Sequence, residues 1–160
     1  VLDRVAILQF SKVGRDIARQ LQVMGAQNKA SFDAQQRALS AEGQALRQQV
    51  AILAADARQK REDAFNEKIR NAEDSAQRKQ TQIQAAAQAA QSAVAQALAP
   101  IVQQIVKERG ANLVLDKASV IFAGSNAFDI TPDTIARLDA KLPSYKVTLG
   151  AAAPAAANKK

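Results

Sequence analysis

The sequence contains no cysteine and no histidine. Without cysteine there is no disulfide, thiol nucleophile or thiolate metal site, and without histidine the commonest metal ligand and the neutral-pH proton carrier are missing. Neither of the glycine-rich phosphate-binding motifs, G-x-x-x-x-G-K-[ST] and G-x-G-x-x-G, occurs. We therefore expect a protein that is not an enzyme, with no catalytic, cofactor-binding or metal-binding residues and no cofactor.

Large apolar side chains are also scarce. Alanine accounts for 36 of the 160 residues, and Val, Ile, Leu, Met, Phe and Tyr together for 40. Alanine is the best helix former but fills little core volume. The composition therefore predicts long, slender helices rather than a thick globular core.

Helix-breaking residues are absent over a long stretch, because neither glycine nor proline occurs from residue 44 to residue 99. A single straight helix of that length would reach about 84 Å, at 1.5 Å per residue. We expect instead an antiparallel helical hairpin over residues 12–109, with its tip near residues 54–63, where apolar residues lapse among charges. Large apolar residues recur at helical spacing on both sides of that tip: Phe32, Leu39, Leu46, Leu53, Phe65, Ile69 and Ile83.

Residues 80–106 carry no charge. The glutamines in this stretch argue against a membrane span, because their side chains would be stranded in lipid. Two interpretations remain: helix positions that let two arms approach closely, or a smooth, weakly apolar wall for a bound chain. Pro100 is predicted to act as a hinge, and Gly110 to end the helix.

Both ends of the sequence predict short strands. Residues 4–10 carry apolar side chains on both faces, and residues 113–115 and 120–123 fit a hairpin around a turn at 116–117. Ser11 is expected to cap the first long helix, and Thr131 with Pro132 to start a last helix that ends at Leu142 and Pro143. Residues 145–149 fit either a further strand or a coil.

These features predict an α+β protein that is mostly helical. Residues 1–11 and 110–150 form a small β-rich body, 12–109 the arm, and 151–160 a disordered tail. Three short strands with one helix cannot bury their own apolar residues. The body should therefore be completed by other copies of the chain, through an interface made by Val5, Ile7, Leu113, Leu115, Val120 and Phe122.

The formal net charge is +7, which favours contact with negatively charged partners. Basic residues near the expected tip are candidates for contact with a polypeptide client or an anionic surface; they are Arg58, Lys60, Arg61, Lys68, Arg70, Arg78 and Lys79. Their other interpretation is a solvated helix surface with intrahelical ion pairs. Specific nucleic-acid binding is not expected, because acidic residues interrupt the basic ones, whereas tracking of phosphates favours a stripe of one charge sign.

The strand-like VAILQF segment, the block ANLVLDKASVIFAG and the segment FDITPDTIARLD resemble the Skp/OmpH family of periplasmic chaperones. The resemblance implies a homotrimer, with body strands in a barrel-like core and three coiled-coil tentacles around a cavity. It also implies an ATP-independent holdase that keeps unfolded outer-membrane proteins from aggregating before membrane insertion, and contact with anionic lipid or lipopolysaccharide.

The same resemblance implies a periplasmic location. Because the sequence begins with Val1, we expect a signal peptide to have been removed. The alternative from another functional class is a structural coiled-coil spacer, which requires a seam without interruptions. A basic nucleic-acid-binding protein is a further alternative.

Overall fold

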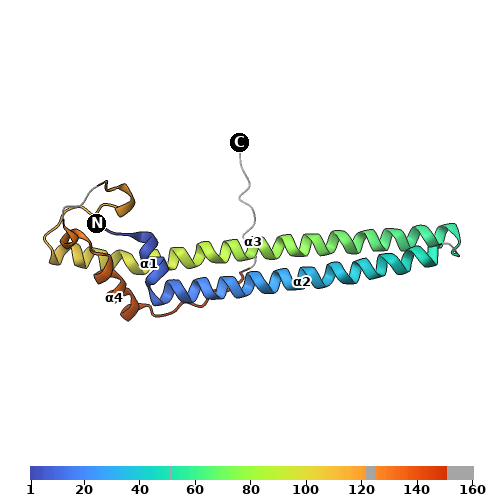
Figure 1. Ribbon diagram of the computed structural model, residues 1–160, viewed down its shortest axis with the longest axis horizontal. Coiled ribbons are helices and arrows are strands. Elements are labelled where there is room, and N and C mark those ends of the chain that lie inside the picture. The colour runs from blue at the N-terminus through green and yellow to red at the C-terminus, as the bar shows by residue number, and fades with distance from the viewer. Residues whose placement is uncertain (51, 122–124, 151–160) are drawn as a thin grey trace. The chain divides into compact units, whose positions relative to one another are not determined.

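The computed structural model describes residues 1–50, 52–121 and 125–150 (Figure 1). The α-helices are α1 (Arg4–Phe10), α2 (Lys12–Val50), α3 (Ala55–Glu108) and α4 (Thr131–Lys141), with two short 3-10 helices, η1 (Lys117–Ser119) and η2 (Asn126–Phe128), before α4. The chain divides into two compact units. Residues 1–22 and 85–149 form the first, which we call the body, and residues 23–84 build the second, which we call the arm.

The expected N-terminal strand is wrong, because the structure shows α1 over these residues. The Asp3 side chain caps the helix by accepting a hydrogen bond from the Ala6 N–H at 2.8 Å. Ile7, at the centre of α1, is 0% exposed, and α1 packs against α4. A short run with apolar residues on both faces fits a buried helix as well as a strand. Here the hydrogen bond of the Asp3 side chain to the first turn favours the helix.

The body hairpin is also not formed as expected. Residues 113–115 are not in a strand, and the described residues make one isolated parallel bridge, between Leu2 and Asp116. Val120 lies in irregular structure, and Phe122 and Ala123 lie outside the described residues. A strand needs a neighbour along its length, and within one chain the segment is paired only at Leu2. The strands of the predicted β body are therefore not seen in the described part of a single chain.

The turn between the two long helices is shorter than predicted. Helix α2 ends at Val50 and α3 begins at Ala55, so residues 55–63 form the first turns of α3 rather than the tip. Alanine, arginine, lysine and glutamate are good helix formers. The loss of large apolar residues in this segment therefore thins the packing without breaking the helix.

The start of α2 is fixed by two polar contacts. The Ser11 hydroxyl, fully buried, accepts a hydrogen bond from the Gly14 N–H at 3.1 Å, as the sequence predicted. The Lys12 N–H donates to Asp139 Oδ1 of α4 at 2.7 Å. A Cβ atom placed on Gly14 would lie 1.9 Å from the Leu8 carbonyl oxygen. Only glycine therefore allows α1 to approach α2 this closely.

The body contains the buried core of the chain. Among the described residues, the apolar side chains that are less than a tenth exposed all lie in the body; they are Ile7, Val13, Ile17, Ala86, Ala90, Val94, Ile101, Ile105, Ile130, Leu138 and Val147. Five of these lie on α3 in the uncharged stretch. The stretch therefore packs one face of α3 into the body, and both of its interpretations, which concern the arms, stay predictions.

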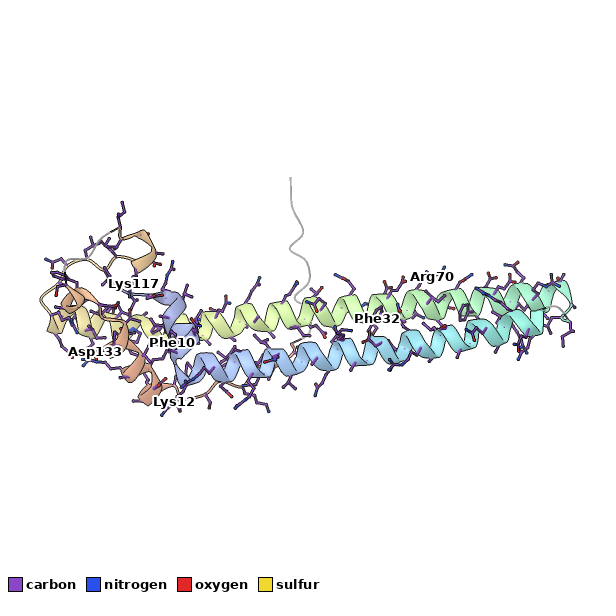
Figure 2. All side chains as sticks on the ribbon, in the orientation of Figure 1. Phe10, Lys12, Phe32, Arg70, Lys117 and Asp133 are labelled. Carbon is purple, nitrogen blue, oxygen red and sulfur yellow. The ribbon has the colours of Figure 1, made fainter. Side chains whose placement is uncertain are left out.

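The arm is packed more loosely. Among its described residues none is fully buried, and the side chains of Phe32, Leu39, Leu46, Phe65 and Ile69 are half-buried. Figure 2 shows Phe32 between α2 and α3. Gly43 makes room for the Phe65 ring, because a Cβ atom there would lie 3.0 Å from Phe65 Cζ. The thin seam predicted from the sequence is confirmed.

The end of α3 agrees with the sequence. Gly110 adopts a positive φ of 61°, and the Ala111 N–H donates to the Val106 carbonyl at 3.0 Å, as in a left-handed helix cap. Pro100 lies inside α3, which continues through it to Glu108, so its role as a hinge stays a prediction. Thr131 is not the cap of α4; its Oγ1 instead accepts from the Asp3 N–H at 2.9 Å. No described helix is both long enough and apolar enough to span a membrane.

Candidate functional site

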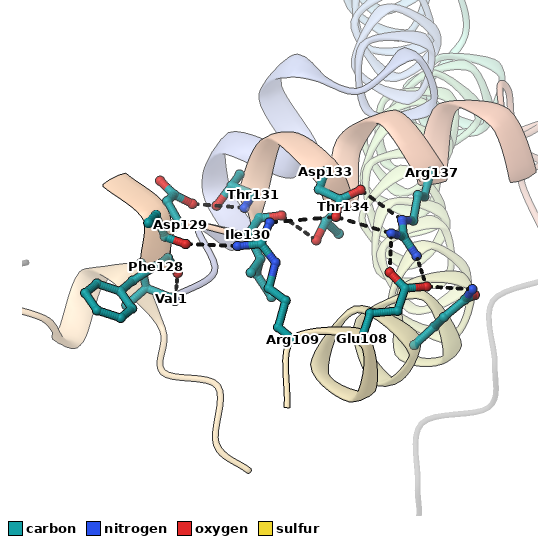
Figure 3. A network of polar contacts seen from close by, with 12 residues as sticks. Val1, Glu108, Arg109, Phe128, Asp129, Ile130, Thr131, Asp133, Thr134 and Arg137 are labelled. Carbon is teal, nitrogen blue, oxygen red and sulfur yellow. Dashed lines mark hydrogen bonds and ion pairs between the residues drawn. The ribbon is translucent and has the colours of Figure 1, made fainter. Parts of the chain in front are cut away.

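A network of charged side chains joins the end of α3 to α4 (Figure 3). Arg137 on α4 donates two hydrogen bonds to the Glu108 carboxylate, at 3.0 and 2.6 Å, and its Nε donates to Asp133 at 2.8 Å. The bond from Arg137 lowers the pKa of Glu108, and the bond to Glu108 raises the pKa of Arg137. The fork shape of the guanidinium fixes the orientation of α4 through both carboxylates.

A second ion pair holds the segment before α4. The Asp129 carboxylate accepts from the Thr131 N–H at 2.9 Å and from Lys117 Nζ at 2.9 Å. Burial acts to raise the pKa of Asp129, but the hydrogen bonds from Thr131 and Lys117 outweigh it and lower that pKa to about 2. The side chain of Asp129 is 21% exposed, so the pair contributes to holding η1 against the start of α4.

We expect this pair to make body stability depend on pH in the acid range. Because folding lowers the pKa of Asp129 from 3.8 to about 2, its stabilisation is complete above pH 4 and is lost as the pH falls through 2. The variant Asp129→Asn should unfold more easily than the wild type by about 2 kcal/mol at pH 6. Denaturant unfolding of both proteins at pH 6, 4, 3 and 2 measures the difference, and a difference that stays constant over this range would contradict the assignment.

The body carries several exposed apolar side chains. Val5 is 72% exposed, Leu113 73%, Leu115 49% and Phe128 64%. Leu113 and Phe128 line an open groove of about 460 Å³, together with residues of the end of α3 and of the segment that follows it. Apolar residues left in water in this number are candidates for contact with another molecule.

The predicted interface residues divide into four groups. Val5, Leu113 and Leu115 lie exposed on the body, and Val120 is half-buried. Ile7 is fully buried within its own chain, so it serves the core of the body rather than its surface. Phe122 lies outside the described residues. The pattern of alternate apolar residues did not predict Phe128, because it stands alone between turn residues.

The seven predicted basic contact residues all lie exposed on α3 within the arm. Two of them contact α2: Lys68 forms an ion pair with Glu42 at 2.5 Å, and Arg61 donates to Gln49. The other five have no ion-pair partner among the described residues; they are Arg58, Lys60, Arg70, Arg78 and Lys79. Figure 2 shows Arg70 on the outer side of α3. These cations are available for contact with another molecule.

Two shallow grooves flank the Phe65 ring on the arm. One of about 480 Å³ is lined by Leu39, Gly43, Leu46 and Phe65 with polar neighbours, and one of about 300 Å³ lies toward Gln49 and Arg61. Both are open and mix apolar with charged side chains. Contacts in such grooves bury little area and are individually weak. In the part of the chain that the structure describes, no cluster of acidic residues could hold a metal ion.

Comparison with known proteins gives a consistent result. A family model described as "Outer membrane protein (OmpH-like)" matches residues 1–138. The chain also resembles the crystal structure of a protein from Caulobacter crescentus CB15 that is described as OmpH-like and as a candidate outer membrane chaperone. The two share 26% identity over 91% of this chain and 85% of that one, with a TM-score of 0.84. No curated protein matches the chain.

Proposed function

Because this chain belongs to the OmpH-like family, we propose that it is an ATP-independent holdase for unfolded outer-membrane proteins. It acts in the periplasm and binds its clients without chemical change until they insert into the membrane. The observation that carries the proposal is the match of the family model to residues 1–138. The chaperone description of the Caulobacter protein supports it.

The packing of the arm supports the same function. A rigid spacer needs a continuous seam of large side chains, whereas the described arm has no fully buried residue. Helices held by few buried contacts open locally at low cost. An arm of this kind adapts to clients of different sizes, and many weak contacts along it hold a client by multivalency.

The exposed apolar surface of the body supports assembly. We propose that Val5, Leu113, Leu115 and Phe128 are covered by other copies of the chain in a homotrimer, whose arms surround the client. Burial of this surface between copies would remove it from water, which is favourable in proportion to its area. If residues 113–115 paired as strands between copies, their backbone N–H and C=O groups would gain hydrogen-bond partners that a single chain does not supply through a sheet.

Suppression of aggregation tests the holdase directly. An unfolded outer-membrane β-barrel protein is diluted from urea with and without this chain, in the absence of nucleotide, and light scattering is followed. We expect scattering to be suppressed at about one trimer per client. Scattering that is unchanged by an excess of the chain would contradict the proposed function.

We expect the unpaired cations of the arm to speed client capture. The variant in which Arg58, Lys60, Arg70 and Arg78 become glutamine should capture a negatively charged client about 10-fold more slowly at low ionic strength, and the difference should shrink in high salt. Stopped-flow fluorescence of a labelled client measures the rate. The matched control changes four exposed body cations to glutamine, Lys12, Arg15, Lys107 and Lys141, and so removes the same net charge.

Equal slowing in both variants would assign the effect to net charge rather than to the arm. If neither variant differs from the wild type at low salt, the arm cations are solvated surface only. The capture assay contains no lipid, so it does not test contact with anionic lipid or lipopolysaccharide, which is a separate proposal. Binding of the chain to vesicles with and without anionic lipid tests that contact.

A further inference from the structure

The segment that follows α4 lies against the first turns of α2 in the body (Figure 1). We call residues 142–149 the strap. Its described residues form no strand or helix. The side chain of Val147 is 3% exposed, whereas Lys146 and Thr148 on either side of it are exposed. The strap therefore presents alternate residues inward, as an extended chain does.

The contacts that hold the strap go from two side chains of α2 to its main chain. Gln20 Nε2 donates to the Tyr145 carbonyl at 2.8 Å, and Gln20 Oε1 accepts from the Val147 N–H at 2.9 Å. The Tyr145 N–H donates a long hydrogen bond to Asp16 Oδ2, at 3.4 Å. The same oxygen also accepts from Gln20 Nε2 at 2.8 Å, which fixes the orientation of the amide.

The main-chain groups of the strap that Asp16 and Gln20 bind are those that a β-strand uses to pair with a neighbouring strand. The N–H and C=O of one residue and the N–H two residues later are the groups that one strand edge presents. Asp16 and Gln20 are four residues apart and share a face of α2. A helix thus supplies two side chains in place of a neighbouring strand. Recognition through main-chain groups depends little on sequence, apart from one small apolar residue at the position of Val147.

The strap lies beyond the family match, which ends at residue 138, whereas Asp16 and Gln20 lie within it. We propose that Asp16 and Gln20 form a site for an extended polypeptide, which the strap occupies as an internal ligand. An unfolded client displaces the strap and takes the same hydrogen bonds with its own main chain. This last step rests on the proposed function, whereas the existence of an exchangeable site does not.

A peptide tests the site in the full chain. The probe is a fluorescent peptide with the sequence of residues 142–150, LPSYKVTLG. The variant Val147→Asp places a charge in the buried position and releases the strap. Anisotropy should show the peptide binding to this variant at least about 10-fold more tightly than to the wild type, whose site is filled by its own strap.

Three further variants control this result. Thr148→Asp introduces the same carboxylate at an exposed position and should bind like the wild type. Val147→Ser disturbs the body less and should bind with intermediate strength. Val147→Asp combined with Gln20→Ala releases the strap but removes the site, and should lose the gain in binding. If no variant binds the peptide, or if the gain survives Gln20→Ala, the proposed site is overturned.

The client step is tested on the same complex. Unfolded outer-membrane β-barrel protein should displace the bound peptide from Val147→Asp. Failure to displace it, from a chain that still suppresses aggregation, would overturn the client step and leave the proposed function standing. A wild-type chain that does not suppress aggregation would contradict the proposed function, while the peptide measurement would still decide whether the site exists.

Discussion

Replacing Gly14 with alanine is expected to destabilise the body severely. The added methyl group would lie 1.9 Å from the oxygen and 2.6 Å from the carbon of the Leu8 carbonyl. These are main-chain atoms of α1, so the clash is relieved only if α1 moves away from α2. That movement would separate α1 from α4 and disturb the burial of Ile7. We expect a loss of about 3 kcal/mol in the free energy of unfolding.

Gly25 in the same helix provides a matched control. Apart from its chain neighbours and the adjoining backbone of its own helix, no atom lies within 4 Å of a Cβ atom placed on it. Gly25→Ala should therefore raise stability by about 0.5–1 kcal/mol, because alanine has the higher helix propensity. Denaturant unfolding followed by circular dichroism measures both variants. Equal stability of the two would contradict the close approach of α1 and α2.

The variant Leu113→Glu is expected to dissociate the proposed trimer. Leu113 is 73% exposed in a single chain and lines the apolar groove of the body. If other copies cover this surface, the substitution buries an unpaired carboxylate, which is strongly unfavourable. The molar mass from light scattering should fall from that of three chains to that of one.

Ile52→Glu is the matched control for assembly. Ile52 is 86% exposed between α2 and α3, and the same change there should leave the mass unaltered. A mass of three chains for Leu113→Glu would place the subunit interface elsewhere. A mass of one chain for the wild type would contradict the trimer itself.

The long-range organisation was predictable from the sequence because it depends on periodicity and on helix breakers. The half-buried seam at Phe32, Leu39, Phe65 and Ile69 follows from helical spacing. The cap at Gly110 follows from the need for a positive φ at the end of α3. Both signals are local in the sequence, and tertiary contacts do not override them.

The ends of the chain were predicted less well because their structure depends on particular contacts. Residues 4–10 fit a strand by pattern, but the Asp3 cap and the packing of α1 against α4 make them a helix. The tip was placed too late, since a lapse in apolar residues does not end a helix made of good helix formers.

The main-chain partners of Asp16 and Gln20 left no pattern in the sequence. These two residues look like ordinary polar positions on the outer face of a helix. Their partners at residues 145–147 lie more than a hundred residues away in the chain. The one indication was the alternation in residues 145–149, which fits an extended segment but does not identify the helix against which it lies.

The division of the chain has a consequence for how the length of the arm can vary among relatives. The body is assembled from residues 1–22 and 85–149. The arm, residues 23–84, is therefore a single insertion in the sequence of the body. Even for a fully flexible insertion, the entropy cost of closing it would rise by only about 0.6 kcal/mol for each doubling of its length. Paired gains or losses of seven residues in α2 and α3 would preserve the seam and change the arm by about 10 Å. The reach of the arm can therefore evolve almost independently of the stability of the body.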